Sequence, residues 1–189
     1  MFDLFTVKDD TGVSTSDEIC LMEKYVSSDS ANRTSHSVRL DPAETNLIAT
    51  IEKRIATIAQ MDVSHLEPLV VVKYDEGQYF KEHHDGKFRP VTVLIYLNAA
   101  KMVNHLFERN IDTTLDVEEG GETQFLRLGL KILPSCGSAL TWRNCDDSGE
   151  ADLNLLHEAL PPKKGVKWAV NCFFNCKAIR VEDEQEVSS

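Results

Sequence analysis

Several signals that would assign a protein to a class are missing from this 189-residue chain. No apolar run approaches the roughly 18 residues that a membrane-spanning helix requires, so we expect no membrane segment. The opening residues, MFDLFTVKDD, contain no basic stretch followed by a long apolar one, so they do not resemble a secretory leader. No internal repeat is visible. These absences, together with the length, favour one globular domain with a full hydrophobic core.

Cysteine patterns of known function are also missing. Five cysteines are present, at positions 20, 136, 145, 172 and 176, and none of them forms a CxxC motif. This odd number without CxxC indicates neither a disulfide framework nor a zinc ribbon. Cys172 and Cys176 lie in a strand-like run, where four residues span roughly 13 Å, too far for a disulfide. We interpret most of the thiols as small buried side chains, which leaves the redox compartment open.

Positive charge is scarce, because 20 Lys and Arg residues stand against 31 Asp and Glu residues, giving a net charge of −11. Binding of nucleic acid depends on neutralising phosphates with basic side chains, so this balance argues against a nucleic-acid partner. It is compatible with a basic peptide partner, although acidity that only maintains solubility is the simpler explanation. The proportions of hydrophobic (42%) and charged (27%) residues are those of an ordinary soluble protein.

The first part of the chain is expected to be mainly helical. Ser16 is a candidate cap for a short helix that reaches Val26, and residues 27–37 form a polar segment that we interpret as a loop. A clearer helix is expected from Asp41, which caps it, with Pro42 at its first position and Glu44 completing a capping box. Its apolar stripe consists of Leu47, Ile48, Ile51, Ile55 and Ile58.

From residue 68 onward the pattern predicts short strands. They are Leu69–Tyr74, Val91–Leu97, Ser138–Trp142, Lys167–Phe174 and Ala178–Val181, which are rich in β-branched or aromatic residues. This order favours an α+β, mainly β domain over residues 1–181, a barrel or double-sheet jelly roll braced by N-terminal helices. Residues 99–119 are expected to be a long loop, either a lid or a variable surface insertion. The acidic tail, residues 182–189, is expected to be disordered.

The segment His83-His84-Asp85 is a candidate metal site. On a strand, alternate residues point to one face, so His83 and Asp85 would face the same way and His84 would point away. A distant His157 would complete a set of two histidines and one carboxylate, which suits non-haem Fe(II) and leaves open coordination positions. The spacing alone is weak evidence, because a loop can contain His-x-Asp by chance and a lone histidine is often an ordinary core residue.

The order of the surrounding residues is more specific. Taken together, it resembles the catalytic domain of the prolyl 4-hydroxylases, within the Fe(II)- and 2-oxoglutarate-dependent dioxygenases, and the likeness runs from about Asn32 to Asn175. The matching residues are Asn32-Arg33-Thr34-Ser35, Tyr74, Gly77, Gln78, His83, Asp85, Arg89, Thr92, Tyr96-Leu97-Asn98, Gly120-Gly121-Glu122-Thr123, Phe125, Pro134, Gly137-Ser138-Ala139-Leu140, Asn144, His157-Glu158-Ala159, Gly165 and Lys167-Trp168.

This resemblance implies a double-stranded β-helix of the jelly-roll, cupin-like type, with iron bound by His83, Asp85 and His157. It also implies that Lys167 pairs with the far carboxylate of 2-oxoglutarate, a role that a buried point charge can fill. The family positions matched by Tyr74, Tyr96 and Thr123 face the cosubstrate, and Tyr74 would donate to its carboxylate. For both tyrosines, core packing is the alternative. Arg89 matches a residue of the substrate groove.

The activity implied is hydroxylation of a peptidyl proline, using Fe(II), 2-oxoglutarate, O₂ and ascorbate and releasing succinate and CO₂. The carboxylate at Asp85 favours hydroxylation over halide transfer, which in related enzymes needs a small residue there. The expected partner is a Pro-containing peptide. The compartment is expected to be the cytoplasm for a complete chain and the endoplasmic reticulum if a leader has been removed.

Two departures from the family weaken the substrate assignment. Phe80 stands three positions before His83, where many relatives carry a tyrosine, and the connection from Asp85 to Arg89 is short. The open alternatives are a related oxygenase that acts on another side chain or a small molecule, and a catalytically silent binding or sensing barrel.

Overall fold

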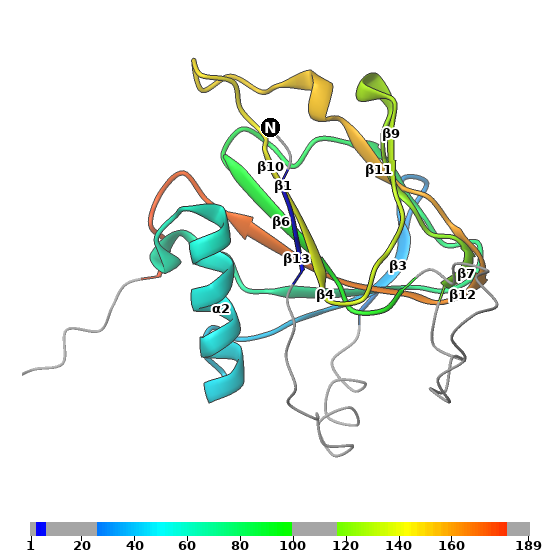
Figure 1. Cartoon of the computed structure of the whole chain (residues 1–189), viewed down its shortest axis with the longest axis horizontal. Coiled ribbons are helices and arrows are strands. Elements are labelled where there is room, and N and C mark those ends of the chain that lie inside the picture. Colours follow the sequence, from blue (N-terminus) through cyan, green and yellow to red (C-terminus); the bar gives the residue numbers. More distant parts are fainter. Residues whose placement is uncertain (1–2, 7–25, 100–116, 181–189) are drawn as a thin grey trace, which may run out of the picture.

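Most strands of the computed structural model belong to two antiparallel sheets that face each other (Figure 1). The structure describes residues 3–6, 26–99 and 117–180. The large sheet has the order β1 (Asp3–Thr6), β10 (Ser138–Arg143), β6 (Val91–Tyr96), β13 (Lys167–Phe174), β4 (Val70–Tyr74), β3 (Thr34–Arg39) and β2 (Val26–Asp29). The small sheet has the order β5 (Phe80–His83), β11 (His157–Ala159), β8 (Thr123–Phe125) and β9 (Leu130–Ile132).

A third pair, β12 (Pro162–Gly165) and β7 (Val117–Gly120), lies beside these sheets. The remaining elements are the helix α2 (Asn46–Ala59) and the short 3₁₀ helices η1 (Val63–His65), η3 (Leu126–Leu128) and η4 (Leu153–Leu155). This is the predicted jelly-roll architecture, mainly β with a bracing helix. No helix among the described residues is long and apolar enough to cross a membrane.

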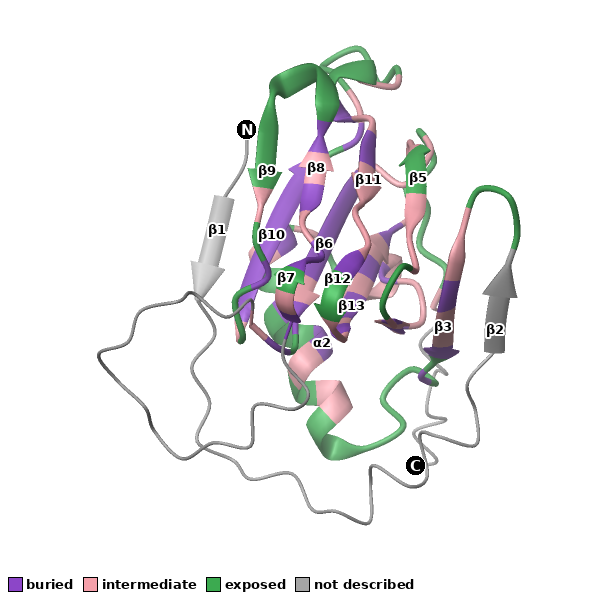
Figure 2. Ribbon diagram, turned by 90° about the vertical axis from the view of Figure 1, so that its right-hand side faces the viewer, coloured by how far each residue is buried: buried purple, intermediate pink, exposed green. Residues whose placement is uncertain are grey.

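Alternation along the central strands separates two cores. On β6, Val91 and Val93 pack in a cluster with α2 residues such as Ile55, while Leu94 and Tyr96 belong to a second cluster inside the barrel. The central strands β6, β10 and β13 are accordingly the most deeply buried part of the large sheet, whereas β5 and β9 of the small sheet are more exposed (Figure 2). The helix therefore braces the outer face of the large sheet, and the inner face is left for the site.

The structure corrects the predicted start of the helix. Thr45, not Asp41, is the cap, and its hydroxyl accepts a hydrogen bond from the Ile48 amide at 3.1 Å. Ala43 has a φ of +52°, a left-handed conformation that a helix cannot include, so residues 41–45 form a turn before the first helical residue. Four residues of the predicted apolar stripe pack in the core, namely Ile48, Ile51, Ile55 and Ile58. Leu47 is instead 46% exposed, and the capping-box pattern was misleading.

Three other boundaries differ from expectation. The segment 27–37, predicted to be a loop, contributes to β2 and β3, because its polar residues pair along the edge of the sheet. Residues 178–180 are not a strand; the amides of Ile179 and Arg180 donate to the carbonyl of Ser64 instead. Residues 117–119 belong to β7, while the rest of the predicted long loop (100–116), the short helix before Val26 and the tail from residue 182 lie outside the described residues.

Candidate metal centre

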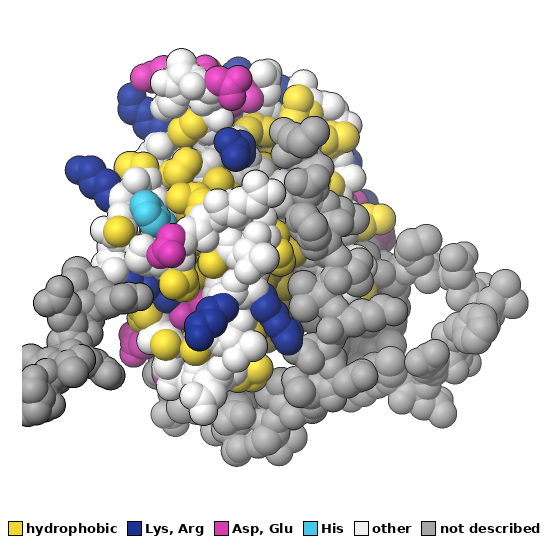
Figure 3. All heavy atoms as spheres, turned by 60° about the vertical axis from the view of Figure 1, so that its left-hand side comes forward, with side chains coloured by type: hydrophobic (Ala, Val, Ile, Leu, Met, Phe, Trp, Pro, Cys, Tyr) yellow, Lys and Arg dark blue, Asp and Glu magenta, His cyan; other side chains and the backbone are white. Residues whose placement is uncertain are grey.

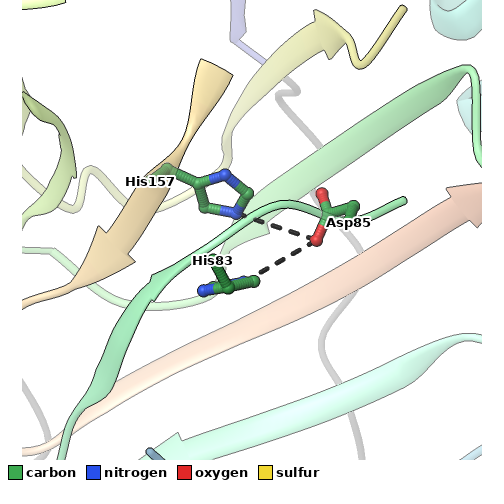
Figure 4. Close-up of side chains that lie close together, drawn as sticks. All are labelled: His83, Asp85 and His157. Carbon is green, nitrogen blue, oxygen red and sulfur yellow. Dashed lines mark ion pairs between the residues drawn. The ribbon is translucent and has the colours of Figure 1, made fainter. Parts of the chain in front are cut away.

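Two neighbouring strands bring the candidate metal ligands together. His83 ends β5 and His157 begins β11, and the two residues are direct partners in the antiparallel pairing of these strands. Asp85 follows in the turn after β5 rather than on the strand itself, which corrects the expected strand geometry. The carboxylate still points to the two imidazoles (Figure 4). Its Oδ1 lies 3.7 Å from His83 Nε2 and 3.8 Å from His157 Nε2.

Backbone carbonyls fix the protons of both imidazoles. The Nδ1 of His83 lies 2.8 Å from the Lys81 carbonyl, and the Nδ1 of His157 lies 3.0 Å from the Leu155 carbonyl. Because a carbonyl can only accept, each Nδ1 carries the proton, and each Nε2 of a neutral ring is a bare acceptor. Burial, together with the neighbouring His157, lowers the pKa of His83 to about 4, so its ring is neutral at neutral pH.

The three converging atoms can hold a cation. The Nε2 atoms of the two imidazoles and one carboxylate oxygen lie within 4.8 Å of one another, and a cation between such acceptors would offset their repulsion. This donor set, two nitrogens and one oxygen on one side of an ion, fits non-haem Fe(II). The structure thus places His83, Asp85 and His157 together as the sequence predicts.

A chain of buried hydrogen bonds orients the carboxylate. The Thr92 hydroxyl donates to Asp85 Oδ2 at 2.7 Å, and the side-chain amide of Asn144 donates to Thr92 Oγ1 at 2.8 Å. The indole of Trp142 donates in turn to Asn144 Oδ1 at 2.8 Å. Since Oδ2 is engaged by Thr92, only Oδ1 of Asp85 faces the metal position. Asp85 is thereby arranged to provide a single ligand atom.

Aromatic rings enclose the metal position. Trp142 meets the His157 ring edge to face, with centroids 4.9 Å apart, and Phe125 lies 5.3 Å from the same ring. On the other side, Phe80 stacks on His83 with centroids 3.6 Å apart. These contacts keep the imidazoles in a largely apolar setting. His84 points elsewhere, as expected, since its Nε2 donates to the Asn144 carbonyl at 3.0 Å and its Nδ1 accepts from Gly86.

The metal position opens into a cavity of about 690 Å³ between the sheets. The alternation that separates the two cores also forms this cavity, because the inward residues of three large-sheet strands line it. They are Val70, Val72 and Tyr74 of β4, Thr92 and Leu94 of β6, and Lys167, Ala169, Asn171 and Phe173 of β13.

Lys167 supplies a buried positive charge in this cavity. Its side chain is only 2% exposed, and burial lowers its pKa from 10.5 to about 7. The ammonium donates to Thr123 Oγ1 at 3.3 Å and lies 5.7 Å from the ring centre of Tyr74, its direct cross-strand partner. Among the residues that the structure describes, no carboxylate forms an ion pair with it. An anionic ligand would satisfy this charge.

Thr123 and Tyr74 line the cavity as predicted, but Tyr96 does not. The Tyr96 hydroxyl donates to Thr123 Oγ1 at 2.8 Å, so this tyrosine contacts the site through Thr123 and packs in the core, the alternative considered for it. Tyr74 is 3% exposed, and burial raises the pKa of its phenol, an effect that the nearby Arg33 charge opposes.

Arg89 also lines the cavity, but its charge is already paired. Its Nε and Nη2 donate to the two carboxylate oxygens of Glu67 at 2.8 and 2.7 Å, and its guanidinium lies 4.1 Å from the ring centre of Phe173. This pair is therefore a preformed wall of the cavity. Arg89 still has donors that can face a peptide, but its charge is not free to pair with an acidic ligand.

Arg33 is the functional candidate that sequence reasoning missed. It lines the cavity, donates from Nε to Ser35 Oγ at 2.8 Å, and has a buried Nη2 with no hydrogen-bond partner in the structure. Such a donor is costly unless a ligand accepts from it. The available signal was the motif Asn32-Arg33-Thr34-Ser35. Because the segment was read as a loop, its arginine was not placed beside β5.

Comparisons with known proteins agree on one family. The model of the 2OG-Fe(II) oxygenase superfamily matches residues 69–175, which include the three candidate metal ligands and Lys167. Prolyl 4-hydroxylase subunit alpha-2 of Gallus gallus is 31% identical over 143 residues, covering 76% of this chain and 26% of the relative. Probable prolyl 4-hydroxylase 6 of Arabidopsis thaliana is 27% identical and covers 84% of this chain and 61% of its own length.

Solved structures show the same fold. The viral collagen prolyl hydroxylase of Paramecium Bursaria Chlorella virus-1, in its 2OG complex, has a TM-score of 0.61 at 24% identity and covers 83% of both chains. The Trichoplax adhaerens prolyl hydroxylase bound to a hypoxia inducible factor peptide fragment has a TM-score of 0.58 at 15% identity, covering 92% of this chain and 83% of that one. This chain spans about a quarter of the length of the Gallus gallus relative.

Proposed function

Because the chain belongs to the 2OG-Fe(II) oxygenase superfamily, we propose that it is an iron- and 2-oxoglutarate-dependent dioxygenase that hydroxylates a prolyl residue of a peptide. The balanced reaction converts a C–H bond, 2-oxoglutarate and O₂ into a C–OH group, succinate and CO₂. The observation that carries this proposal is the convergence of His83, Asp85 and His157 in the same cavity as the unpaired ammonium of Lys167.

Each group of the site has a defined task in this reaction. His83, Asp85 and His157 would hold iron, which when bound supplies the activation of O₂ and the oxidation of the C–H bond. Lys167 would bind the far carboxylate of 2-oxoglutarate, with Thr123 and Tyr74 beside it as further hydrogen-bonding groups. Thr92 holds Asp85 so that only one carboxylate oxygen would bind the metal.

The part of the cavity wall that contains Arg33, Arg89 and Phe173 is suited to an extended peptide. Arg33 presents an unpaired donor, and the Glu67–Arg89 pair and Phe173 form a firm wall with both polar and aromatic surface. A Pro-containing segment in the polyproline II conformation exposes carbonyls and apolar rings, which match these groups. The relatives named for prolyl hydroxylation support the same substrate class.

One observation favours a second candidate, a related oxygenase that hydroxylates another side chain or a small molecule. Phe80 cannot offer a phenolic hydroxyl to the substrate, although many prolyl hydroxylases have a tyrosine there. A change in the substrate wall without a change in the metal ligands would alter which C–H bond is presented.

A peptide panel separates these possibilities. The full chain is incubated with Fe(II), 2-oxoglutarate, ascorbate and Pro-rich peptides, and mass spectrometry with fragmentation locates any added oxygen. We expect a gain of one oxygen on proline, which disappears in His157→Ala and persists in His36→Ala, a histidine outside the cavity. Succinate release with oxygen on another residue would support the second candidate. Failure to release succinate with any peptide would refute hydroxylation of a peptide and leave a small-molecule substrate or a silent binding barrel.

A further inference from the structure

We propose that Phe80 and Arg33 are positioning residues that fix the ring plane of His83, with the Arg33 guanidinium over the phenyl ring and the phenyl ring stacked on the imidazole. The proposal rests on the metal-binding role proposed above for His83. It assigns Phe80 to the support of the metal ligand, whereas the sequence alone marked this residue only as a departure in the substrate groove.

The stacking of Phe80 on His83 restrains the imidazole. Their ring centres are 3.6 Å apart and their planes differ by 16°, so the two rings lie nearly face to face. The bond from His83 Nδ1 to the Lys81 carbonyl fixes one edge of the imidazole but does not by itself prevent it from tilting. A flat phenyl ring against the face of the imidazole does prevent this tilt. If the imidazole rotated, one of its edges would lose contact with the phenyl ring and the other would clash with it.

A bulge in β5 is what allows this contact. His157 pairs with His83 and Ala159 pairs with Phe80, so two steps along β11 correspond to three steps along β5. In a regular strand, residues three apart point to opposite faces. The extra residue of β5 reverses that relation and turns Phe80 to the same side as His83. The bulge is therefore a local feature that directs an aromatic ring onto the metal ligand.

Arg33 holds the phenyl ring from the neighbouring segment. It forms an isolated bridge opposite Phe80, and its guanidinium carbon lies 4.8 Å from the centre of the ring. The guanidinium is itself held by the bond from Nε to Ser35 Oγ, and Ser35 is 1% exposed. A cation over an aromatic face is attracted to it, so Arg33 favours the ring position that stacks on His83.

Binding of Co(II) to the full-length, metal-free chain tests the proposal without requiring turnover. Dissociation constants and visible absorption bands are measured for wild type and for Phe80→Leu, which keeps apolar volume but removes the ring. We expect Phe80→Leu to bind Co(II) about tenfold more weakly, with shifted bands, in line with other changes to residues that orient metal ligands. Phe80→Tyr, which keeps the stack, should behave like wild type, as should Glu82→Gln, an exposed neighbour in β5.

The outcomes separate this inference from the proposed function on which it rests. Wild-type affinity and bands in Phe80→Leu would overturn this inference while leaving the proposed function intact. A wild-type chain that does not bind Co(II) would overturn the proposed function and this inference with it. Thermal unfolding of the metal-free variants checks that they are folded. If Phe80→Leu unfolds, Arg33→Met gives the same comparison with the ring in place: weaker binding supports the inference, and unchanged binding refutes it.

Discussion

At the scale of single residues, Lys167 links cosubstrate binding to pH. Its pKa of about 7 means that the ammonium loses its proton as the pH rises through neutrality, while binding of a carboxylate favours the charged form. We therefore expect 2-oxoglutarate to bind the metal-loaded protein with uptake of a proton near pH 8, and its affinity to fall as the pH rises above 7. Calorimetry in two buffers of different ionisation enthalpy measures this uptake.

The control for this prediction is Lys167→Met. Any binding that remains in this variant should lack the part of the proton uptake that Lys167 supplies. Equal proton uptake in wild type and variant would show that another group titrates.

The same lysine should reduce the stability of the ligand-free protein. Its folded-state pKa lies below the unfolded value of 10.5, so the unfolded state binds more protons between about pH 7 and 10.5, and stability rises with pH across that window. Replacing it by methionine removes a buried charge, and we expect Lys167→Met to be more stable at pH 7 by about 1–4 kcal/mol. Urea unfolding at pH 7 and pH 10 measures this gain, which should shrink at the higher pH.

Thr92 permits a second test, which concerns the hydrogen bond that orients Asp85. Thr92→Val keeps the shape of the side chain but removes the donor to Asp85 Oδ2 and the acceptor for Asn144. We expect Mn(II) affinity, measured by electron paramagnetic resonance, to fall by about 10- to 100-fold. Thr92→Ser, which keeps the hydroxyl, should retain most of it. Equal affinity in the valine and serine variants would contradict a role for the hydroxyl.

Single-residue roles were predictable to different degrees. His83, Asp85, His157 and Lys167 could be named because the order of their neighbours is specific. Arg33 was marked by its motif, but its contact with Phe80 could not be predicted, because it joins two segments that are far apart in the sequence.

At the scale of secondary-structure elements, the segment after β13 acts as a clamp on α2. Arg180 donates two hydrogen bonds to the carboxylate of Glu52, at 2.8 and 2.9 Å, and a third to the carbonyl of Leu66 at 2.7 Å. Glu52 is 2% exposed on the helix face that packs against the sheet. The clamp therefore joins the last described residues to the bracing helix.

Removing one side of this pair should be costly. Arg180→Met leaves Glu52 buried without its partner, and we expect a loss of about 3–5 kcal/mol in the free energy of unfolding, measured by urea denaturation. The double variant Glu52→Leu/Arg180→Met should recover a large part of the loss, because it leaves no unpaired charge. A single variant as stable as wild type would show that the pair makes no net contribution.

Elements with strong apolar patterns were predictable, and those defined by polar contacts were not. The strands of the barrel centre follow from β-branched runs, as in Val91–Tyr96. Residues 178–180 have a similar composition, but their amides bond to η1 and Ile179 is 44% exposed, so composition gave the wrong element. Likewise, the position of the first residue of α2 depends on the backbone turn at Ala43 rather than on the capping-box sequence pattern.

At the scale of the whole molecule, the site lies between two sheets and should couple ligand binding to global stability. A ligand at 100 times its dissociation constant stabilises the folded state by about 2.7 kcal/mol, which corresponds to roughly 5–10 °C for a chain of this size. We expect Mn(II) to raise the melting temperature by such an amount, and 2-oxoglutarate to add to it only when Mn(II) is present. His157→Ala should lose both shifts, and an equal shift in that variant would place the metal elsewhere.

Figure 3 shows one face of the molecule with its side chains. Among the described residues on that face, lysines and arginines are dispersed between hydrophobic, polar and acidic side chains.

The barrel architecture was predictable because the spacing of the strands and the alternation of their side chains indicate which residues are buried. The order of strands in each sheet was not, since pairing such as β13 with both β4 and β6 joins segments far apart in the chain.

The bulge between Phe80 and His83 also affects how this protein should be aligned with its relatives. The bulge sets the spacing of the aromatic ring and the imidazole on one face of β5, because its extra residue lies between Phe80 and His83. A relative without the extra residue would then carry its corresponding aromatic two positions before the histidine instead of three. Homologous positions on this wall of the cavity are therefore defined by the face that they occupy, and an alignment needs a gap only where a relative lacks the extra residue.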